Sequence, residues 1–479
     1  MALSNFTSNK LTIAVGAIDE NGKPTEYSTP GASLLIAAPG GDATQEQSVN
    51  TGFGIMSADI QGTGGYNKTE GKDGDYAYQS QGTSYSGPMV GGAIALMLQA
   101  NPNLGFRDVS TILAMTARKV DESNASWINT KSTDWNLGGM HFSRDFGYGL
   151  LDVSAATRLT ESWSAAAGTY ANWKVAEAAS THASMQIPDN NADGISVTAN
   201  IDANVKIERM EFDLNLTADS PSQLKATITS PSGTTITLFD QPLTRDLVDG
   251  SPDMKNPEAA WPKTFTIGST AFLGETSAGT WTLKLSDAVT GVVASYNSLT
   301  VRAWGSAISL DSQYIMINEF SSSDVVLNDE SGIDTVNASA TASAVSINLQ
   351  AGQKSIVGNA ANNLLRGNAG NDQLNGDAGI DTALYLGSRK DYSILKQGSG
   401  FSVKDKVSTD GTDQLSNIEA IKFSDMSINL KVGENSKTID SNSLKSIIEL
   451  YIAYFNRVPD ADGMSYWIDQ NRNGVSIEE

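Results

Sequence analysis

Three nine-residue segments follow one another without a gap between residues 358 and 384, and they constrain the fold more than any other feature of the sequence. Each segment begins with glycine. The sixth position is occupied by Asn363, Asp372 and Asp381, and the eighth by Leu365, Leu374 and Ala383. A fixed period requires each copy to adopt the same local structure and to stack on its neighbours. The glycines permit tight turns, and the eighth position supplies apolar side chains for a shared core.

The side chains at the sixth position predict a cation site. Calcium prefers carboxylate, amide and main-chain oxygen ligands, which these turns can provide. The segments resemble RTX repeats, and the resemblance implies a parallel β-roll that binds calcium between one turn and the turn two repeats later. We expect Asn363 and Asp381 to form the complete site, whereas Asp372 has no clear partner downstream. A disordered Gly/Asn-rich linker is the alternative interpretation.

The segments on either side of the repeats carry weaker signals. Residues 329–336 contain a similar pattern and predict a possible isolated half-turn. Residues 391–425 resemble the β-rich stretch that follows such repeats in secreted bacterial proteins. We therefore assign residues 310–430 to one calcium-binding region.

The amino-acid composition limits the classes of ligand that the chain can bind. Its 54 acidic and 32 basic residues give a formal net charge of -22, which attracts divalent cations and disfavours nucleic acid. There is no cysteine, so disulfides and thiolate metal sites are excluded. No apolar run has the length of a membrane span. A length of 479 residues predicts several domains.

The hydrophobic pattern divides the rest of the chain into three further modules. Residues 1–160 alternate buried strands with apolar helices, which indicates an α/β domain. Residues 165–306 contain short alternating strands separated by turns, as in a β-sandwich or jelly roll. Residues 440–479 have apolar residues at helical spacing and form a short helical module of unknown function that looks truncated. The predicted fold class is therefore multidomain.

The sequence GTSYSGPMVGG at residues 82–92 predicts a nucleophile. It places Ser84 just before an apolar helix, where free N–H groups and the helix dipole can stabilise an oxyanion. We expect Pro88 to lie in the first helical turn, where its missing N–H costs nothing. A serine that only caps the helix is the alternative interpretation.

The whole string resembles the serine motif of subtilisin/kexin-like peptidases, and the similarity extends over residues 1–160. It implies that Ser84 attacks peptide bonds to form an acyl-enzyme, with a protein or peptide as substrate. Residues 165–306 resemble the P (homo-B) domain of kexin-like convertases, on segments that include SPSGT at 230–234 and GTWTL at 279–283. That resemblance implies a jelly roll that packs on the catalytic domain and stabilises it.

The partners of the serine are missing. The family order is Asp, His, Ser, yet the chain has only two histidines, His141 and His182, and both follow Ser84. We therefore expect a fragment that needs the N-terminal half of the catalytic domain and is inactive alone. The leading interpretation is an extracellular, bacterial, calcium-dependent serine endopeptidase. The alternative is a non-catalytic calcium-dependent surface or adhesion protein with a relic protease domain.

Overall fold

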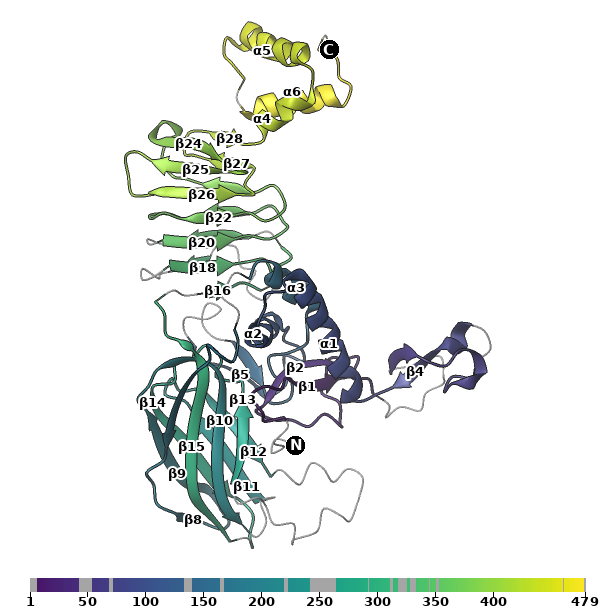
Figure 1. The fold of residues 1–479 in the computed structure, drawn as a ribbon, viewed down its shortest axis with the longest axis vertical. Helices are drawn as coiled ribbons and strands as arrows, with labels where there is room; N and C mark the ends of the chain where they lie inside the picture. The colour runs from purple at the N-terminus through teal and green to yellow at the C-terminus, as the bar shows by residue number, and fades with distance from the viewer. Residues whose placement is uncertain are drawn as a thin grey trace. The chain divides into compact units, whose positions relative to one another are not determined.

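The computed structural model describes most of the chain, which groups into two compact units, Met1–Ile308 and Ser309–Glu479 (Figure 1). The described residues are 7–42, 54–68, 72–132, 140–163, 168–218, 223–241, 264–291, 293–310, 313–317, 325–327, 333–343, 345–349, 353–459 and 461–477.

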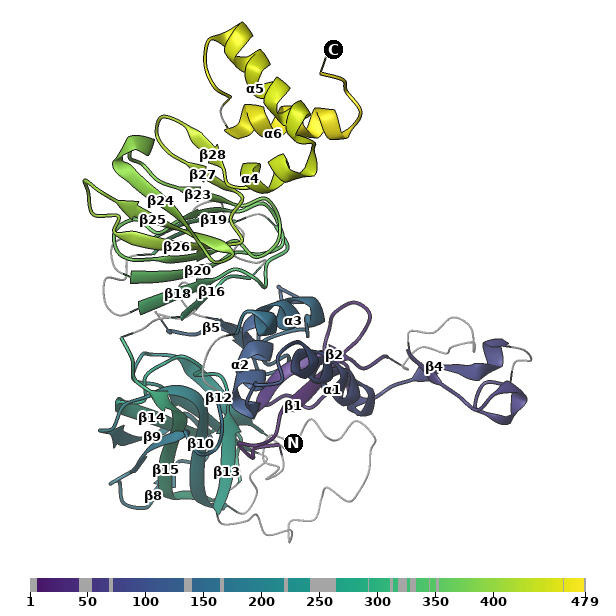
Figure 2. The same cartoon turned by 45° about the horizontal axis from the view of Figure 1, so that its top comes forward.

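The first unit begins with an α/β region. The apolar segments expected as strands form β1 (Ala14–Ile18) and β2 (Leu34–Pro39), which pair in parallel. Helix α1 (Thr83–Ala100) packs on both strands, followed by α2 (Phe106–Thr116) and α3 (Val153–Glu161) (Figure 2). The parallel strands and the helix behind them position the start of α1 beyond the carboxyl end of β2.

Helix α1 starts earlier than the sequence predicts. Gly82 precedes it with φ of +126°, a conformation that favours glycine, and Pro88 lies inside the helix. The prediction that Pro88 occupies the first turn is therefore wrong. The missing N–H of Pro88 removes the hydrogen bond that the Ser84 carbonyl would otherwise accept.

Only one face of α1 is covered. Its buried side chains recur at helical spacing and face the sheet, namely Ser86, Val90, Ala93 and Met97. On the rest of the helix, Leu96 is 48% exposed and Leu98 is 41% exposed. An apolar helix would ordinarily bury these side chains.

Short elements complete the α/β region. Strands β3 (Ile55–Ala58) and β4 (Tyr76–Ser80) form an antiparallel pair joined through the 3-10 turns η1 (Gly62–Gly64) and η2 (Lys72–Asp75). This pair extends away from β1 and β2 in both views (Figures 1 and 2). Strands β5 (Trp127–Asn129) and β6 (His141–Ser143) form a second antiparallel pair.

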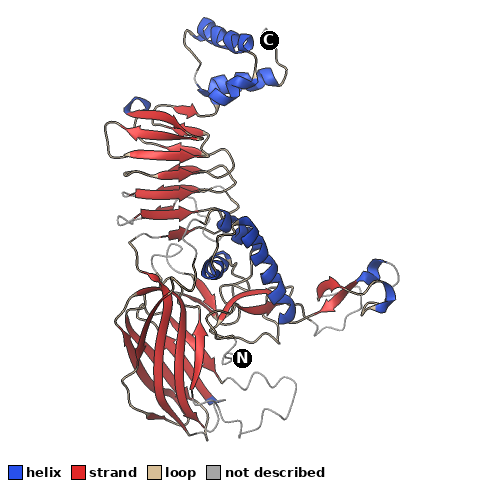
Figure 3. Cartoon of the chain, in the orientation of Figure 1, coloured by secondary structure: helices blue, strands red, loops and turns tan. Residues whose placement is uncertain are grey.

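The second part of the first unit consists of two antiparallel sheets (Figure 3). The strands of the first sheet, in spatial order, are β13 (Thr264–Ser269), β10 (Val205–Ala218), β15 (Ala294–Ala307) and β7 (Lys174–Ala179), with β8 (Met185–Ile187) also pairing with β15. The strands of the second sheet, in spatial order, are β12 (Thr235–Asp240), β11 (Leu224–Thr229), β14 (Gly279–Asp287) and β9 (Asn191–Ile201). The apolar alternation of these strands buries Phe212 and Trp281 completely, and Phe272, in the turn after β13, packs edge-on against both rings.

The second unit is a stack of parallel strands in two sheets. One sheet contains β16 (Gln313–Ile315), β18 (Ile333–Asn337), β20 (Gln353–Val357), β22 (Gln373–Asn375) and β26 (Thr412–Ser416), followed by the antiparallel β25 (Gly400–Asp405) and β24 (Tyr392–Gln397). The other contains β17 (Val325–Leu327), β19 (Ser346–Leu349), β21 (Leu364–Arg366), β23 (Thr382–Leu384) and β27 (Ala420–Lys422), followed by the antiparallel β28 (Ser427–Asn429).

The nine-residue period explains this stack. Successive repeats contribute β21, β22 and β23 alternately to the two sheets, so repeats two apart pair in parallel. Leu365, Leu374 and Ala383 are buried, as the pattern of eighth positions predicts. The segment expected as an isolated half-turn is instead a full rung of the stack, because β18 pairs with both β16 and β20; residues 329–332 lie outside the described part.

The chain ends in short helices beyond β28. These are α4 (Val432–Asn435), the 3-10 turn η7 (Ser436–Thr438), α5 (Ser441–Phe455) and α6 (Ala461–Arg472). The helical pattern at residues 441–467 is divided by Asn456, whose left-handed conformation ends α5. Ile447, Met464 and Ile468 form a small core between the helices.

Candidate functional site

Ser84 is exposed at the second position of α1, and its surroundings hold the backbone in place. The buried Ser86 hydroxyl donates to the Pro39 carbonyl at the end of β2, at 3.0 Å. The Tyr27 hydroxyl donates to the Gly40 carbonyl at 2.6 Å and accepts the Gly82 N–H at 3.1 Å. These bonds join the start of the helix to the carboxyl end of the sheet, so the Ser84 hydroxyl is presented at a rigid edge.

The first turn of α1 supplies oriented N–H groups beside Ser84. The N–H of Tyr85 bonds to the Gly82 carbonyl at 3.0 Å, and the N–H groups before it have no intrahelical acceptor. Together with the helix dipole, such groups stabilise an anion that develops on a substrate oxygen.

Two surface cavities flank the serine. A groove of about 740 Å³ is lined by Gln81 and Tyr85 on one side and by residues of the β3–β4 pair on the other. A second cavity of about 200 Å³ is lined by Thr83, Tyr27 and Pro30. The two cavities are thus lined by the chain neighbours of Ser84, Thr83 for one and Tyr85 for the other.

The two histidines have other partners. A ring nitrogen of His141 is 2.7 Å from the Tyr148 carbonyl, and the ring packs edge-on against Trp127. A ring nitrogen of His182 is 3.1 Å from the Thr198 hydroxyl on an exposed part of the β-sandwich. Both interactions are typical of structural or surface histidines.

The α/β region is joined to the β-sandwich by buried ionic contacts. The Arg107 guanidinium forms a bidentate pair with Glu208, through Nε at 2.7 Å and Nη2 at 2.5 Å, and is only 7% exposed. The Tyr148 hydroxyl donates to the Thr270 carbonyl at 2.6 Å, and the Thr270 hydroxyl donates to the Leu34 carbonyl at 3.0 Å. Strand β2, which leads to the serine, is therefore braced by the sandwich.

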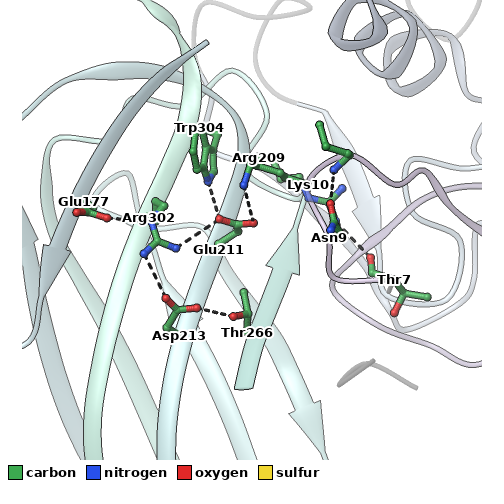
Figure 4. Close-up of polar contacts among 11 residues, drawn as sticks. Thr7, Asn9, Lys10, Glu177, Arg209, Glu211, Asp213, Thr266, Arg302 and Trp304 are labelled. Carbon is green, nitrogen blue, oxygen red and sulfur yellow. Dashed lines mark hydrogen bonds and ion pairs between the residues drawn. The ribbon is translucent and has the colours of Figure 1, made fainter. Parts of the chain in front are cut away.

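A second network binds the N-terminal segment to the same sheet (Figure 4). Arg209 is buried and donates to the carbonyls of Thr7 and Thr12, at 3.3 Å each. Burial lowers the pKa of this guanidinium to about 10, and the neighbouring Glu211 carboxylate opposes the shift, so Arg209 is charged at neutral pH. Glu211 also accepts the indole N–H of Trp304 at 2.6 Å.

The SPSGT segment has an internal role. Ser230 donates to the buried Glu275 carboxylate at 2.6 Å, and Thr234 donates to its other oxygen. Thr234 also accepts the N–H of Lys131 from the α/β region at 2.8 Å. These residues stabilise the sandwich and its contact with the α/β region.

In the second unit, the sixth position of each repeat faces the first-position glycine of the same repeat. A Cβ added to Gly358, Gly367 or Gly376 would overlap a side-chain oxygen of Asn363, Asp372 or Asp381, respectively. The glycines thus leave a cradle in which the side-chain oxygens gather, as a cation site requires. Among the described residues, no group of three or more acidic or histidine side chains converges, so calcium ligation would need main-chain and amide oxygens as well.

Asn363 and Asp381, which the sequence predicts to share a site, are brought together. The N–H of Asn363 donates to Asp381 Oδ1 at 2.7 Å, and the N–H of Asp381 donates to Glu419 Oε2 at 2.9 Å. Asp381 is fully buried, and its Oδ2 has no hydrogen-bond partner. Burial raises the pKa of Asp381 to about 6, and the carboxylates of Glu419 and Asp377 add to the shift.

Asp372 has a downstream partner that the sequence does not predict. Its N–H donates to Asp413 Oδ1 at 2.9 Å, and Asp413 Oδ2 accepts the Tyr385 hydroxyl at 2.7 Å. Burial raises the pKa of Asp413 to about 7. The expectation that Asp372 lacks such a partner is therefore wrong, because the stack resumes after an inserted hairpin.

Sequence reasoning missed Asp413 and Glu419. Glu419 directly precedes the short strand β27, just as Asp372 and Asp381 precede β22 and β23, and Asp413 is the second residue of β26. That local position was the available signal. The glycine spacing that marks the repeats is absent there, so the period does not reveal it.

Among the residues that the structure describes, no helix is both long and apolar enough to cross a membrane. The first unit combines a serine at the start of a helix with a two-sheet β-sandwich, and family models match both parts. The subtilase family matches residues 3–149, the proprotein convertase P-domain residues 207–304, and the RTX calcium-binding nonapeptide repeat (4 copies) residues 355–383.

Curated relatives define the class more narrowly. The chain is 26% identical over 320 residues to the Aeromonas extracellular serine protease of Aeromonas sobria, covering 60% of this chain and 50% of that protein. It is 31% identical over 159 residues to the human proprotein convertase subtilisin/kexin type 7, covering 33% and 18%, respectively. The chain is thus a homologue of subtilisin/kexin-like serine proteases, it has P-domain and RTX-repeat matches of its own, and it spans half or less of the length of these relatives.

A solved structure shows the same fold. The crystal structure of the Aeromonas sobria serine protease with its chaperone has a TM-score of 0.51 and 22% identity, covering 63% of this chain and 58% of that one. This similarity supports the fold of the chain.

Proposed function

We propose that the protein is a serine endopeptidase in which Ser84 attacks the peptide carbonyl and forms an acyl-enzyme. The observation that carries the proposal is the exposed Ser84 at the anchored start of α1, with oriented N–H groups beside it and cavities lined by its neighbours Thr83 and Tyr85. A serine hydroxyl needs a general base and an orienting carboxylate. His141 and His182 have structural partners, so the base comes from an additional segment.

The additional segment is the N-terminal half of the catalytic domain. It would cover the exposed apolar face of α1, including Leu96 and Leu98, and bring the aspartate and histidine of the triad to Ser84. The chain alone is then inactive. Because relatives of this chain include an extracellular protease, we place the complete protein outside the cell, with proteins or peptides as substrates.

Expression of the coding sequence extended upstream tests the proposal. The extended protein should hydrolyse a casein substrate, Ser84→Ala should abolish hydrolysis, and the present chain should show none. Ser123→Ala, at an exposed serine, is the control. Activity that survives Ser84→Ala would refute the nucleophile, and Ser84-dependent turnover by the chain alone would refute its inactivity. An upstream sequence without aspartate and histidine motifs would favour the adhesion protein instead.

The second unit would be a calcium-dependent β-roll that supports the extracellular enzyme. Asn363, Asp372 and Asp381 are the proposed ligand residues, with main-chain carbonyls of the glycine turns completing the oxygen coordination. The glycine cradles and the unpaired Asp381 Oδ2 fit a cation there. Bound calcium would supply the positive charge that these buried oxygens lack.

A further inference from the structure

The parallel stack continues past the last repeat through a segment with no repeat sequence. Strand β27 pairs in parallel with β23, with Thr382 opposite Ala420. Between these strands the chain forms the antiparallel pair β24–β25, then rejoins the stack through β26, which pairs with β22. The insertion delivers residues 412–422 to the positions that two further repeats would occupy.

The register of β23 and β27 places Glu419 opposite Asp381 in the next turn of the same sheet. The N–H of Asn363 donates to the carboxylate of Asp381, and the N–H of Asp381 donates to the carboxylate of Glu419 in the same way, at 2.7 Å and 2.9 Å. The Asp381 carbonyl in turn accepts the N–H groups of Glu419 and Ala420 at 3.1 Å and 3.0 Å. Glu419 therefore continues the column of sixth-position side chains, although it lies 38 residues further along the chain.

Two oxygens share the space next to Gly376. A Cβ added to this glycine would overlap both Asp381 Oδ2 and the main-chain carbonyl of Asn417. Asn417 has a positive φ of 50°, and its side chain donates to Asn375 Oδ1 at 2.9 Å, which holds the turn in place. Gly376 has no side chain, so both oxygens can approach its backbone.

The unpaired oxygen indicates what this space binds. Asp381 is fully buried, and Oδ2 has no hydrogen-bond partner, while its Oδ1 is already used by Asn363. A buried carboxylate oxygen without a donor is costly unless a cation compensates it. A second carboxylate, that of Glu419, adjoins the same residue and adds negative charge, which Lys431 Nζ, 3.6 Å from Glu419 Oε1, balances in part.

We propose that a calcium ion binds between Asp381 and the turn at residues 417–419, a site closed by sequence outside the repeats. Asp381 Oδ2 and the Asn417 carbonyl are direct ligands. Glu419 is a positioning residue that orients Asp381 through its N–H and adds charge. This inference rests on the proposed calcium binding of the repeats and extends it across the β24–β25 insertion.

Isothermal titration of the chelator-treated full chain with calcium chloride tests the site. Asp381→Asn and Gly376→Ala should each bind one calcium ion fewer per chain than the unaltered protein. Glu419→Gln keeps an acceptor for the Asp381 N–H but loses the charge, so it should keep the site with about tenfold weaker affinity. Its calcium-free melting temperature should not fall, which separates an electrostatic role from a structural one.

Two controls match these changes. Glu449→Gln removes a negative charge from an exposed position of α5, and Gly433→Ala adds a methyl group where nothing lies within 4 Å. Both should titrate like the unaltered protein. Circular dichroism without calcium checks folding, and if Gly376→Ala does not fold, Asp381→Asn and Glu419→Gln decide the matter.

The outcomes separate this inference from the proposal on which it rests. If Asp381→Asn loses a site but Glu419→Gln and a folded Gly376→Ala bind as the unaltered protein does, the repeats bind calcium and the inference is wrong. Unchanged binding by Asp381→Asn also overturns it. If the unaltered chain binds no calcium, the calcium-dependent roll is refuted together with this site.

Discussion

The Ser84 region and the Asp381 region assemble their oxygen atoms in different ways. At Ser84 one exposed hydroxyl stands at the start of α1, and its neighbours Ser86 and Tyr27 only anchor the backbone. At Asp381 a buried carboxylate oxygen meets the carbonyl of Asn417, which strand pairing brings from outside the repeats. The serine is thus presented by one helix start and the residues that anchor it, whereas the oxygens at Asp381 depend on the stacking of turns that are distant in the sequence.

The largest expected effect is the loss of activity when Ser84 is replaced. In the protein extended upstream, Ser84→Ala should lower kcat/KM by about 10⁴-fold or more, because the remaining groups can bind but cannot attack. Steady-state hydrolysis of a peptide substrate measures the loss. Ser123→Ala should change it less than twofold, within the range of about 0.5 kcal/mol expected of surface substitutions. A loss of similar size in both variants would argue against a specific role for Ser84.

The next prediction compares a closed core with the open face of α1. Trp281→Ala should cost about 3–5 kcal/mol of unfolding free energy, because this side chain is fully buried. Leu96→Ala should cost no more than about 0.5 kcal/mol in this chain, where Leu96 is 48% exposed. Urea unfolding, followed by far-ultraviolet circular dichroism so that the signal does not depend on the replaced tryptophan, measures the unfolding free energy of both variants.

The Leu96→Ala substitution also tests whether the upstream segment covers α1. In the extended protein, Leu96→Ala should cost about 2–5 kcal/mol, because the added segment buries the side chain. An equal and small cost in both proteins would show that the open face of α1 is not covered by the upstream segment.

Calcium should stabilise only the repeat unit. At a free calcium concentration 100 times Kd, one site contributes about 2.7 kcal/mol to the stability of the folded state. Thermal scans with and without chelator should therefore move the transition of the repeat unit upward and leave that of the first unit in place. Circular dichroism should also gain β signal on adding calcium; no change at millimolar calcium would contradict the prediction.

The last prediction is a pH dependence of the calcium-free repeat unit. The pKa values of Asp381, about 6, and Asp413, about 7, lie above the ordinary value of 3.8, so the folded state binds protons more tightly than the unfolded chain. Their contribution to stability is complete below about pH 4 and is lost as pH rises through 6 and 7.

Asp413→Asn isolates the contribution of Asp413 to this pH dependence. We compare its melting temperature with that of the unaltered protein in the presence of chelator. Between pH 5 and pH 8 the stability of the variant should fall less than that of the unaltered protein, because the variant has no carboxylate at position 413 to ionise in this range. The same pH slope in both proteins would show that Asp413 does not contribute. Calcium should reduce the slope, because it binds the ionised carboxylates.

Local pattern alone was sufficient for several features of this protein. The nine-residue period placed Leu365, Leu374 and Ala383 inside the stack and joined Asn363 to Asp381. The serine motif placed Ser84 at the start of a helix. In each case the interaction lies within one helical turn or between repeats at a fixed spacing, so residue type and spacing determine the geometry.

Only the tertiary structure decided the partners across the inserted hairpin. Asp413 meets Asp372 from 41 residues away, and Glu419 meets Asp381 from 38 residues away, with no repeated spacing between them. Strand pairing determines which residues meet, and the pairing of β26 and β27 depends on where the β24–β25 hairpin returns the chain. The position of Pro88 inside α1 has a similar origin, since the bonds of Tyr27 and Ser86 determine where the helix begins.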